Sequence, residues 1–281
     1  MIISASRRTD IPAFYADWLV NRLDAGYCLV KNPRNPAQTR RVSLLPEDVD
    51  GIVLWTKNAA PLLTKLSALD GYSYYFQYTI TSYHSDVETS LADKKTTVIP
   101  AFLKLADTIG PKRMIWRYDP IIITPRYSYE YHLKAFAKLC GLLAGSCEKC
   151  VISFAIAYKS IAKNLAEVGH MRLAAEDKTR LAVDLLRIAK KHGITLCACC
   201  ELPGLYELGV QPISCIDASL FGVDAPCDKH QRKGCNCAVS IDIGVYNSCM
   251  NECRYCYANH NEVTVRKNHA AHRADSELLV D

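Results

Sequence analysis

The feature that most limits the fold is the alternation of two hydrophobic patterns along the chain. Short apolar runs rich in β-branched and aromatic residues predict eight strands, at residues 1–6, 27–31, 51–58, 72–81, 113–120, 150–158, 194–200 and 239–245. Between most of these runs, apolar residues recur at helical spacing, as at residues 98–109, 129–143 and 161–191. Such alternation implies parallel strands with helical crossovers, and eight units close a (β/α)8 barrel. We therefore expect one TIM-like barrel domain over residues 1–281.

Cysteine content is high for a chain of this size, with 14 cysteines in 281 residues. The N-terminal residues do not read as a secretory signal, and no apolar run approaches the roughly 20 residues of a membrane span. We therefore expect a cytoplasmic protein that uses its cysteines for metal rather than for disulfides. A net charge of +5 is only weak support for an anionic partner such as nucleic acid.

Three cysteines follow the last predicted strand at a C-x3-C-x2-C spacing: Cys249, Cys253 and Cys256, with Tyr255 just before the third. Residues 246–258, called the cluster loop below, carry these cysteines. Thiolates from one such short loop can hold three corners of a cubane [4Fe-4S] cluster and leave the fourth iron without a protein ligand. An open iron can bind a small molecule. The alternative is three buried or zinc-binding cysteines, although zinc sites more often use two C-x2-C pairs.

This loop resembles the cluster loop of radical S-adenosylmethionine (SAM) enzymes. The resemblance implies that SAM binds the open iron and is cleaved reductively, with electrons from a donor such as flavodoxin or ferredoxin. In that superfamily the loop follows the first barrel strand, so its place here implies a circularly permuted barrel. The second strand of the superfamily ends in a Gly-Gly-Glu-like segment that holds the SAM amino group. Residues 6–10, Ser-Arg-Arg-Thr-Asp, depart from that pattern.

The chain as a whole resembles an uncharacterised family, the domain of unknown function numbered 1848. The similarity rests on residues 6–12, Ser-Arg-Arg-Thr-Asp-Ile-Pro, on residues 55–58, Trp-Thr-Lys-Asn, and on the C-terminal cysteine region. It extends over nearly the full length. The family is associated with a C-terminal cysteine cluster like the radical SAM one, and the resemblance implies no substrate.

A second group of cysteines lies in a loop segment at residues 201–237 and at the strand end before it. A long segment without helical periodicity and with many thiols favours an ordering metal. We expect four of them, Cys200, Cys215, Cys235 and Cys237, to bind a second iron-sulfur cluster or zinc, with Cys199 or Cys227 as replacements. The remaining cysteines lie in apolar runs that favour core packing: Cys28, Cys140, Cys147, Cys150 and Cys197.

Polar residues at predicted strand ends supply the candidate catalytic groups, because barrel active sites lie at these ends. Arg7 and Arg8 could grip the SAM carboxylate or an anionic substrate through a bidentate fork. Asp10 has either a functional role or that of an N-cap to the next helix. Arg117 and Asp119 form a candidate ion pair at the barrel mouth. Lys57 is a candidate substrate ligand or an ordinary surface lysine.

These patterns together predict a radical SAM-type enzyme acting on a small-molecule or macromolecular substrate. The alternative is a zinc or iron-sulfur protein without catalysis that binds nucleic acid or a protein partner. A metal-dependent hydrolase is disfavoured, because the strand ends lack the His, Asp and Glu ligands that such enzymes use.

Overall fold

The computed structural model describes residues 1–200, 204–232 and 234–281, so residues 201–203 and 233 of the predicted cysteine-rich loop at 201–237 lie outside it. Its strands are β1 (Ile2–Ala5), β2 (Tyr27–Asn32), β3 (Asn35–Ser43), β4 (Gly51–Thr56), β5 (Tyr74–Thr79), β6 (Met114–Ile121), β7 (Lys149–Phe154), β8 (Thr195–Ala198), β9 (Gln211–Pro212) and β10 (Ile241–Asp242). Its α-helices are α1 (Ile11–Phe14), α2 (Ala16–Ala25), α3 (Ala60–Leu63), α4 (Ile99–Ile109), α5 (Tyr129–Leu143), α6 (Ala162–Glu167), α7 (Ala175–Lys191), α8 (Gly204–Glu207) and α9 (Glu262–Ala271).

Local sequence signals account for several helix boundaries. Helix α2 ends at Gly26, whose φ of 73° is a left-handed conformation that glycine adopts without strain. Helix α5 begins after Ser128, whose side chain accepts a hydrogen bond from the backbone N–H of Tyr131. The helical pattern predicted at 161–191 is divided into α6 and α7, with Gly169 at a φ of 73° between them. No helix in the described ranges has the length and apolarity that crossing a membrane requires.

The central sheet contains eight parallel strands in the order β10-β1-β4-β5-β6-β7-β8-β9. Strand β10, which precedes the cluster loop, pairs with β1 through Ile241 and Ile3. Parallel neighbours require crossover connections, and the chain uses the helices between β4 and β8 for this purpose. The segment that carries Cys249, Cys253 and Cys256 therefore begins beside the N-terminal strand.

The predicted TIM-like barrel is wrong, and the expectation of a permuted barrel is lost with it. Within the described ranges, strands β9 and β10 are the two edges of the sheet and do not pair with each other, so the sheet is open. Each of these strands is only two residues long. Between them, residues 213–232 and 234–240 supply no further strand to close a barrel and instead pack across one face of the sheet.

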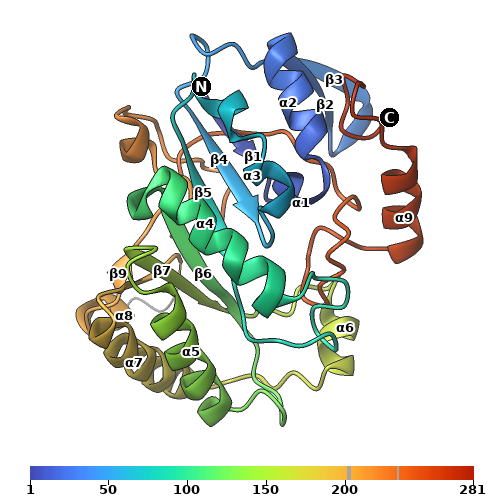
Figure 1. Cartoon of the computed structure of the whole chain (residues 1–281). Coiled ribbons are helices and arrows are strands. Elements are labelled where there is room, and N and C mark those ends of the chain that lie inside the picture. The colour runs from blue at the N-terminus through green and yellow to red at the C-terminus, as the bar shows by residue number, and fades with distance from the viewer. Residues whose placement is uncertain (201–203, 233) are drawn as a thin grey trace.

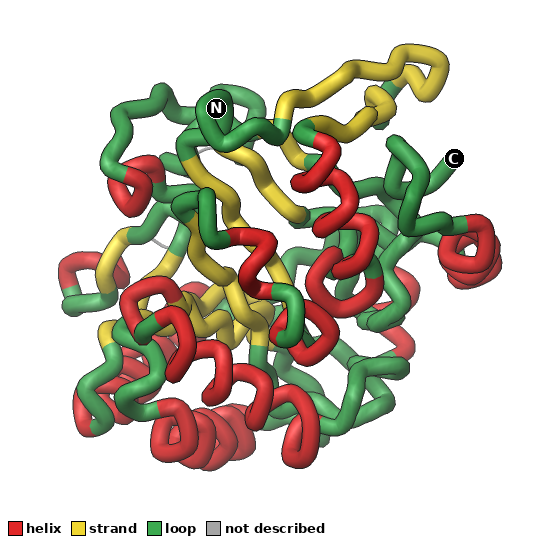
Figure 2. The backbone as a smooth tube through the Cα atoms, turned by 45° about the horizontal axis from the view of Figure 1, so that its top comes forward, coloured by secondary structure: helices red, strands yellow, loops and turns green. Residues whose placement is uncertain are grey.

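The predicted strand at 27–31 also lies outside the central sheet. It is β2, which pairs antiparallel with β3 in a separate two-stranded sheet. Figure 2 shows this hairpin projecting away from the central strands. Strand β3 is polar and exposed over residues 37–41, which suits a hairpin in solvent rather than a strand buried on both faces.

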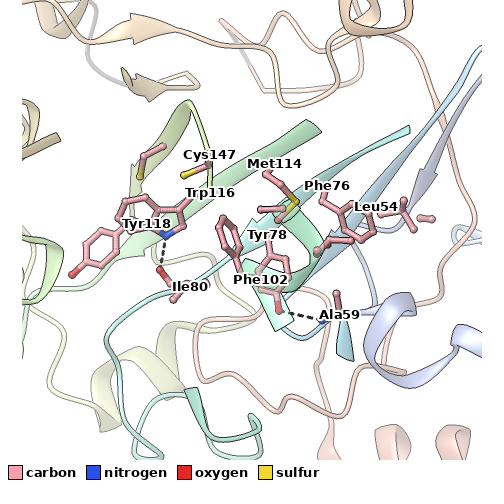
Figure 3. Close-up of a cluster of buried hydrophobic side chains, with 14 of the residues drawn as sticks. Leu54, Ala59, Phe76, Tyr78, Ile80, Phe102, Met114, Trp116, Tyr118 and Cys147 are labelled. Atoms are coloured by element: carbon pink, nitrogen blue, oxygen red, sulfur yellow. Dashed lines mark hydrogen bonds between the residues drawn. The ribbon is translucent and has the colours of Figure 1, made fainter. Parts of the chain in front are cut away.

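One face of the sheet packs against helices α4, α5 and α7, which cross it side by side in Figure 1. Side chains that alternate along the strands meet on this face, including Leu54, Phe76 and Trp116 (Figure 3). Phe102 of α4 packs edge-to-face on Tyr78, with ring centroids 5.1 Å apart. Burial of each large apolar side chain contributes on the order of 2 kcal/mol, so this face supplies much of the core stability.

The opposite face is covered by the described part of residues 213–238, which contains one short 3-10 helix at Ala218–Phe221 and no α-helix. Val53, Tyr75 and Ile115 project from neighbouring strands into an apolar cluster with this segment. Gly51, at the start of β4, lies directly below Phe221, because a Cβ atom on Gly51 would stand 2.2 Å from Phe221 Cδ1. The cysteine-rich segment is thus a packed layer of the fold.

The C-terminal segment returns to the N-terminal elements. Figure 1 shows α9 and the chain that follows it beside α2, β2 and β3. Trp18 Nε1 donates a hydrogen bond to the Ser276 carbonyl over 2.9 Å, and Leu29 forms a backbone bridge with Leu278. The cluster loop between β10 and α9 is therefore fixed at both ends.

Candidate functional site

A cavity of about 730 Å³ opens at the carboxyl ends of the parallel strands. Its walls include residues that end or follow the strands, among them Arg7, Trp55, Arg117 and Ser153. Ligands of open parallel sheets bind at this edge. Seven of the 14 cysteines line the cavity: Cys199, Cys215, Cys235, Cys237, Cys249, Cys253 and Cys256. Both cysteine groups of the sequence therefore face one space.

The three cysteines of the cluster loop occupy one side of this cavity. Cys249 and Cys253 are each 9% exposed, and Cys256 is half-buried. Burial raises the pKa of the Cys249 thiol well above its usual value and that of Cys253 to about 12. Within the described ranges, these three sulfur atoms do not all lie within 4.8 Å of one another. As placed, they are therefore farther apart than the thiols of a compact single-ion site.

Asp10 fixes the cluster loop to the sheet. Its carboxylate accepts hydrogen bonds from Thr56 Oγ1 at 2.6 Å, Lys57 N at 2.7 Å and Asn251 Nδ2 at 3.0 Å. It also caps α1 by accepting from the backbone N–H of Ala13. Burial raises the pKa of Asp10, and these hydrogen bonds oppose that shift. The N-cap role considered for Asp10 is confirmed, and the same side chain also holds Asn251 of the cluster loop.

Lys57 lies beside the cluster loop in a buried ion-pair network. Its Nζ is 2.8 Å from Glu88 Oε1, and Lys94 pairs with the other oxygen of Glu88. Tyr255 donates its hydroxyl hydrogen bond to Glu88, and the Lys57 ammonium lies 5.3 Å from the centre of the Tyr255 ring. Burial acts to raise the pKa of Glu88, but the two lysines outweigh it and hold the pKa at about 2. Burial acts to lower the pKa of Lys57, but Glu88 and then Cys253 raise it above its usual value, so Lys57 is a paired cation near Cys253.

Two arginines meet on Trp55 at the centre of the cavity wall. The guanidinium carbon of Arg7 lies 5.3 Å from the indole centroid, and that of Arg117 lies 5.4 Å from it. Arg117 also pairs with Asp119, with Nε 3.1 Å from Oδ2, so the predicted ion pair is confirmed. Arg8 stacks on Tyr246 at 5.1 Å. Among the described residues, neither Arg7 nor Arg8 forms an ion pair with a carboxylate, so both present positive charge to the cavity.

The second cysteine group is compact. The sulfur atoms of Cys199, Cys235 and Cys237 all lie within 4.8 Å of one another and could hold a metal ion. Hydrogen bonding with Cys215 and Cys237 raises the pKa of the Cys199 thiol, so Cys215 lies near this group, although its sulfur is not one of the three. Cys200 Sγ is 3.5 Å from Cys199 Sγ, but Cys200 does not line the cavity. The cluster thus contains Cys199, one of the two replacements considered, where the expected set had Cys200.

The cysteines that the sequence assigned to core packing do lie in the core. Five are fully buried among apolar side chains: Cys28, Cys140, Cys147, Cys150 and Cys197. Burial raises the pKa of the Cys140 and Cys147 thiols to about 12, which leaves them unreactive. Cys227 is exposed and is not part of the compact group, and its thiol donates to the Asn236 carbonyl over 3.7 Å.

Several residues of the site carried no recognisable sequence signal. Glu88 lies in an irregular segment after β5, and Lys94 begins the short π-helix Lys94–Val98, so the periodicity of strands and α-helices gives no information at either residue. Asp242 at the end of β10 accepts hydrogen bonds from Ser4 Oγ and the Arg7 backbone N–H, which positions the turn that carries Arg7. Asn251 lies between two predicted cluster ligands, and this position in the cluster loop was the one available indication of its role.

Fold and site together define an open parallel α/β protein with a cysteine-lined cavity and a compact group of thiols able to bind metal. The chain belongs to the family described as Domain of unknown function (DUF1848), whose sequence profile matches residues 2–258. The match includes the cluster loop and the second cysteine group. No curated protein matches the chain.

Proposed function

We propose that this protein is a radical SAM-type enzyme with a [4Fe-4S] cluster on Cys249, Cys253 and Cys256. The observation that carries the proposal is the placement of three thiols from one loop around one cavity, at separations wider than a single ion would need. When bound, such a cluster supplies one electron that cleaves SAM into methionine and a 5′-deoxyadenosyl radical, which takes a hydrogen atom from the substrate.

The residues around the loop suit a cluster with negatively charged thiolates. Thiols are the ligands that iron-sulfur clusters require, and Asp10 holds their loop through Asn251. Lys57 places a positive charge near Cys253. The role of Tyr255 is to pack this lysine and Glu88 against the loop. These contacts would stabilise the loop that binds the cluster. The loop itself supplies three thiols and no fourth.

The rest of the cavity suits SAM and a second molecule. A volume of about 730 Å³ lies within the range of ligand pockets. Arg7 and Arg8 would hold anionic groups, either the SAM carboxylate or an anionic substrate, because neither guanidinium group forms an ion pair with a carboxylate among the described residues and both line the cavity. Arg117 and Asp119 shape the floor around Trp55. A flavodoxin or ferredoxin would supply the electron, and a chain with 14 cysteines that uses thiolates as metal ligands suits a reducing cytoplasm.

Production of 5′-deoxyadenosine tests this proposal directly. Protein reconstituted anaerobically with iron and sulfide is incubated with SAM and dithionite, and the nucleoside is quantified by chromatography. Wild-type protein and the exposed-site control Cys227→Ala should release 5′-deoxyadenosine. Cys249→Ala, Cys253→Ala and Cys256→Ala should release none, because each thiolate holds one iron.

The alternative is a metal protein without catalysis that binds nucleic acid or a protein partner. It is favoured by the compact group of Cys199, Cys235 and Cys237, since closed thiolate sites are commonly structural. This alternative predicts that the wild-type protein with full metal content releases no 5′-deoxyadenosine. It also predicts that binding of the partner survives replacement of Cys249, Cys253 and Cys256.

A further inference from the structure

The separation of the sulfur atoms in the second cysteine group limits the kind of metal centre it can hold. Cys199, Cys235 and Cys237 place three sulfurs within 4.8 Å of one another. Four thiolates on one tetrahedral zinc ion, with Zn–S bonds of about 2.3 Å, stand about 3.8 Å apart. Iron-sulfur clusters distribute their thiolates over two or four irons, so the ligands lie farther apart. The observed spacing therefore suits a single ion.

Cys215 is placed to be the fourth ligand. Its backbone carbonyl accepts hydrogen bonds from Tyr75 Oη and Gln77 Nε2, each at 2.9 Å. Its thiol lines the same cavity as those of Cys199, Cys235 and Cys237, is 7% exposed and lies close enough to shift the pKa of Cys199 and Cys237, although its sulfur is not among the three within 4.8 Å of one another. Cys200 is the rival, since its sulfur is 3.5 Å from that of Cys199. Cys200, however, is partly exposed and does not line the cavity that the other four share.

We propose that Cys199, Cys215, Cys235 and Cys237 bind one Zn²⁺ ion in a closed tetrahedral site. Four thiolates and one divalent ion carry a net charge of −2, which needs nearby positive groups when it is buried. Arg117 supplies one, because its Nη1 donates to Cys215 Sγ over 3.3 Å. Arg232 donates from Nη2 to the Cys199 carbonyl over 2.9 Å. Both arginines lie where they oppose the negative charge of the thiolates.

The zinc site fastens the cysteine-rich segment to the sheet. Cys199 follows β8, whereas Cys215, Cys235 and Cys237 belong to the layer at residues 213–238. This layer has little regular secondary structure, and one ion with four ligands would hold its two ends against the strands. Because the four ligands close the coordination sphere, the ion takes no substrate. The site therefore builds one wall of the cavity, and its existence does not depend on the proposed radical SAM chemistry.

Metal analysis of a protein that lacks the cluster loop thiols tests the proposal. The triple variant Cys249→Ala/Cys253→Ala/Cys256→Ala is purified anaerobically, and zinc and iron are quantified. We expect about one zinc per chain and no bound iron. About four irons per chain would assign an iron-sulfur cluster to the second group, and about one iron without zinc would overturn the choice of metal. Absence of both metals would overturn the site itself.

One further cysteine substitution at a time, added to the triple variant, tests which four thiolates bind the zinc ion. Cys235→Ser, at the least buried of the four ligands, should lose zinc, whereas the neighbouring control Cys200→Ser should retain it. Loss of zinc in Cys200→Ser with retention in Cys215→Ser would overturn the assignment of Cys215. If Cys235→Ser fails to fold, cobalt replaces zinc in the triple variant. Intense thiolate-to-cobalt absorption with tetrahedral d–d bands supports four thiolates on one ion, and octahedral bands without thiolate charge transfer contradict them.

Discussion

Asn251 donates a hydrogen bond from Nδ2 to Asp10 Oδ2 over 3.0 Å, which joins the middle of the cluster loop to the turn after β1. The same carboxylate accepts hydrogen bonds from Thr56 and Lys57 at the end of β4. One buried side chain thus connects three segments that are distant in the sequence. The position of the loop thiols depends on this connection.

Replacement of Asp10 by alanine should destabilise the fold and loosen the cluster loop. Asp10→Ala leaves the donors of Thr56, Lys57 and Asn251 without their acceptor in a buried site, and each such loss costs about 1–3 kcal/mol. We expect the free energy of unfolding in urea to fall by about 3 kcal/mol or more. Anaerobically reconstituted protein should also retain less iron.

The matched control for this experiment is Asp17→Ala. Asp17 is exposed on α2 and, among the residues that the structure describes, forms an ion pair only with Lys65 at the surface, so its loss should change the unfolding free energy by less than about 1 kcal/mol. Equal effects of the two substitutions would contradict the connecting role of Asp10.

Acid should destabilise the protein through His132, which is buried and neutral. Its Nδ1 is 2.7 Å from the Tyr118 hydroxyl and its Nε2 is 3.1 Å from the Ile122 carbonyl. Burial lowers the pKa of His132 to about 4. The unfolded chain, with an ordinary histidine pKa of about 6.5, binds the proton first, so stability falls as the pH decreases from about 6.5 to 4.

Substitution of His132 separates its contribution to the acid-induced loss of stability from that of the other titratable groups. Between pH 7 and pH 4, the wild-type protein should lose about 3 kcal/mol more unfolding free energy than His132→Gln, as measured in urea at each pH. His84→Gln, at an exposed position, should follow the wild-type profile. Parallel pH profiles for wild type and His132→Gln would show that this histidine does not control the acid response.

Contact between Gly51 and Phe221 should be sensitive to a single added methyl group. A Cβ atom at position 51 would stand 2.2 Å from Phe221 Cδ1, so Gly51→Ala forces the covering segment away from the sheet. We expect a loss of about 1–3 kcal/mol in unfolding free energy. Phe221→Ala in the same chain should recover part of that loss. A double variant that is as unstable as the sum of the two single variants would argue against the contact.

The sequence predicted the elements better than their arrangement. Helices α4 and α5 lie within a residue of the predicted 98–109 and 129–143, because their apolar spacing and the N-cap at Ser128 are local signals. Barrel closure is a long-range property. Nothing local distinguishes the segment at 213–238, which covers an open sheet, from a loop outside a closed one.

The candidate site was predicted in part. Spacing within one loop identified Cys249, Cys253 and Cys256, which do line the cavity. The compact group contains Cys199 rather than its neighbour Cys200, because the choice depends on which side chain points into the cavity after β8. Glu88 was missed, since its importance comes only from its contacts with Lys57 and Lys94 in the folded chain.

Arg7 and Arg8 should contribute to ligand binding without affecting cluster assembly. Both guanidinium groups stack on aromatic rings at the cavity wall and lack an acidic partner among the described residues. Arg7→Ala or Arg8→Ala should weaken binding of SAM or of an anionic substrate by roughly one hundredfold, measured by equilibrium dialysis. Iron content should stay at the wild-type level.

The exposed Arg187, which pairs with Asp184 on α7, provides the control for these two variants. Arg187→Ala should bind SAM as the wild-type protein does. If both cavity variants also bind with unchanged affinity, the arginines do not recognise the ligand.

The most direct test of the radical SAM proposal is the EPR spectrum of the reduced, anaerobically reconstituted protein with and without SAM. A cluster held only by Cys249, Cys253 and Cys256 leaves one iron open, and binding of SAM at that iron should shift the signal. Cys227→Ala should show the same shift, since this thiol is exposed and does not line the cavity. A fully loaded wild-type cluster whose EPR signal is unchanged by saturating SAM would contradict the proposal.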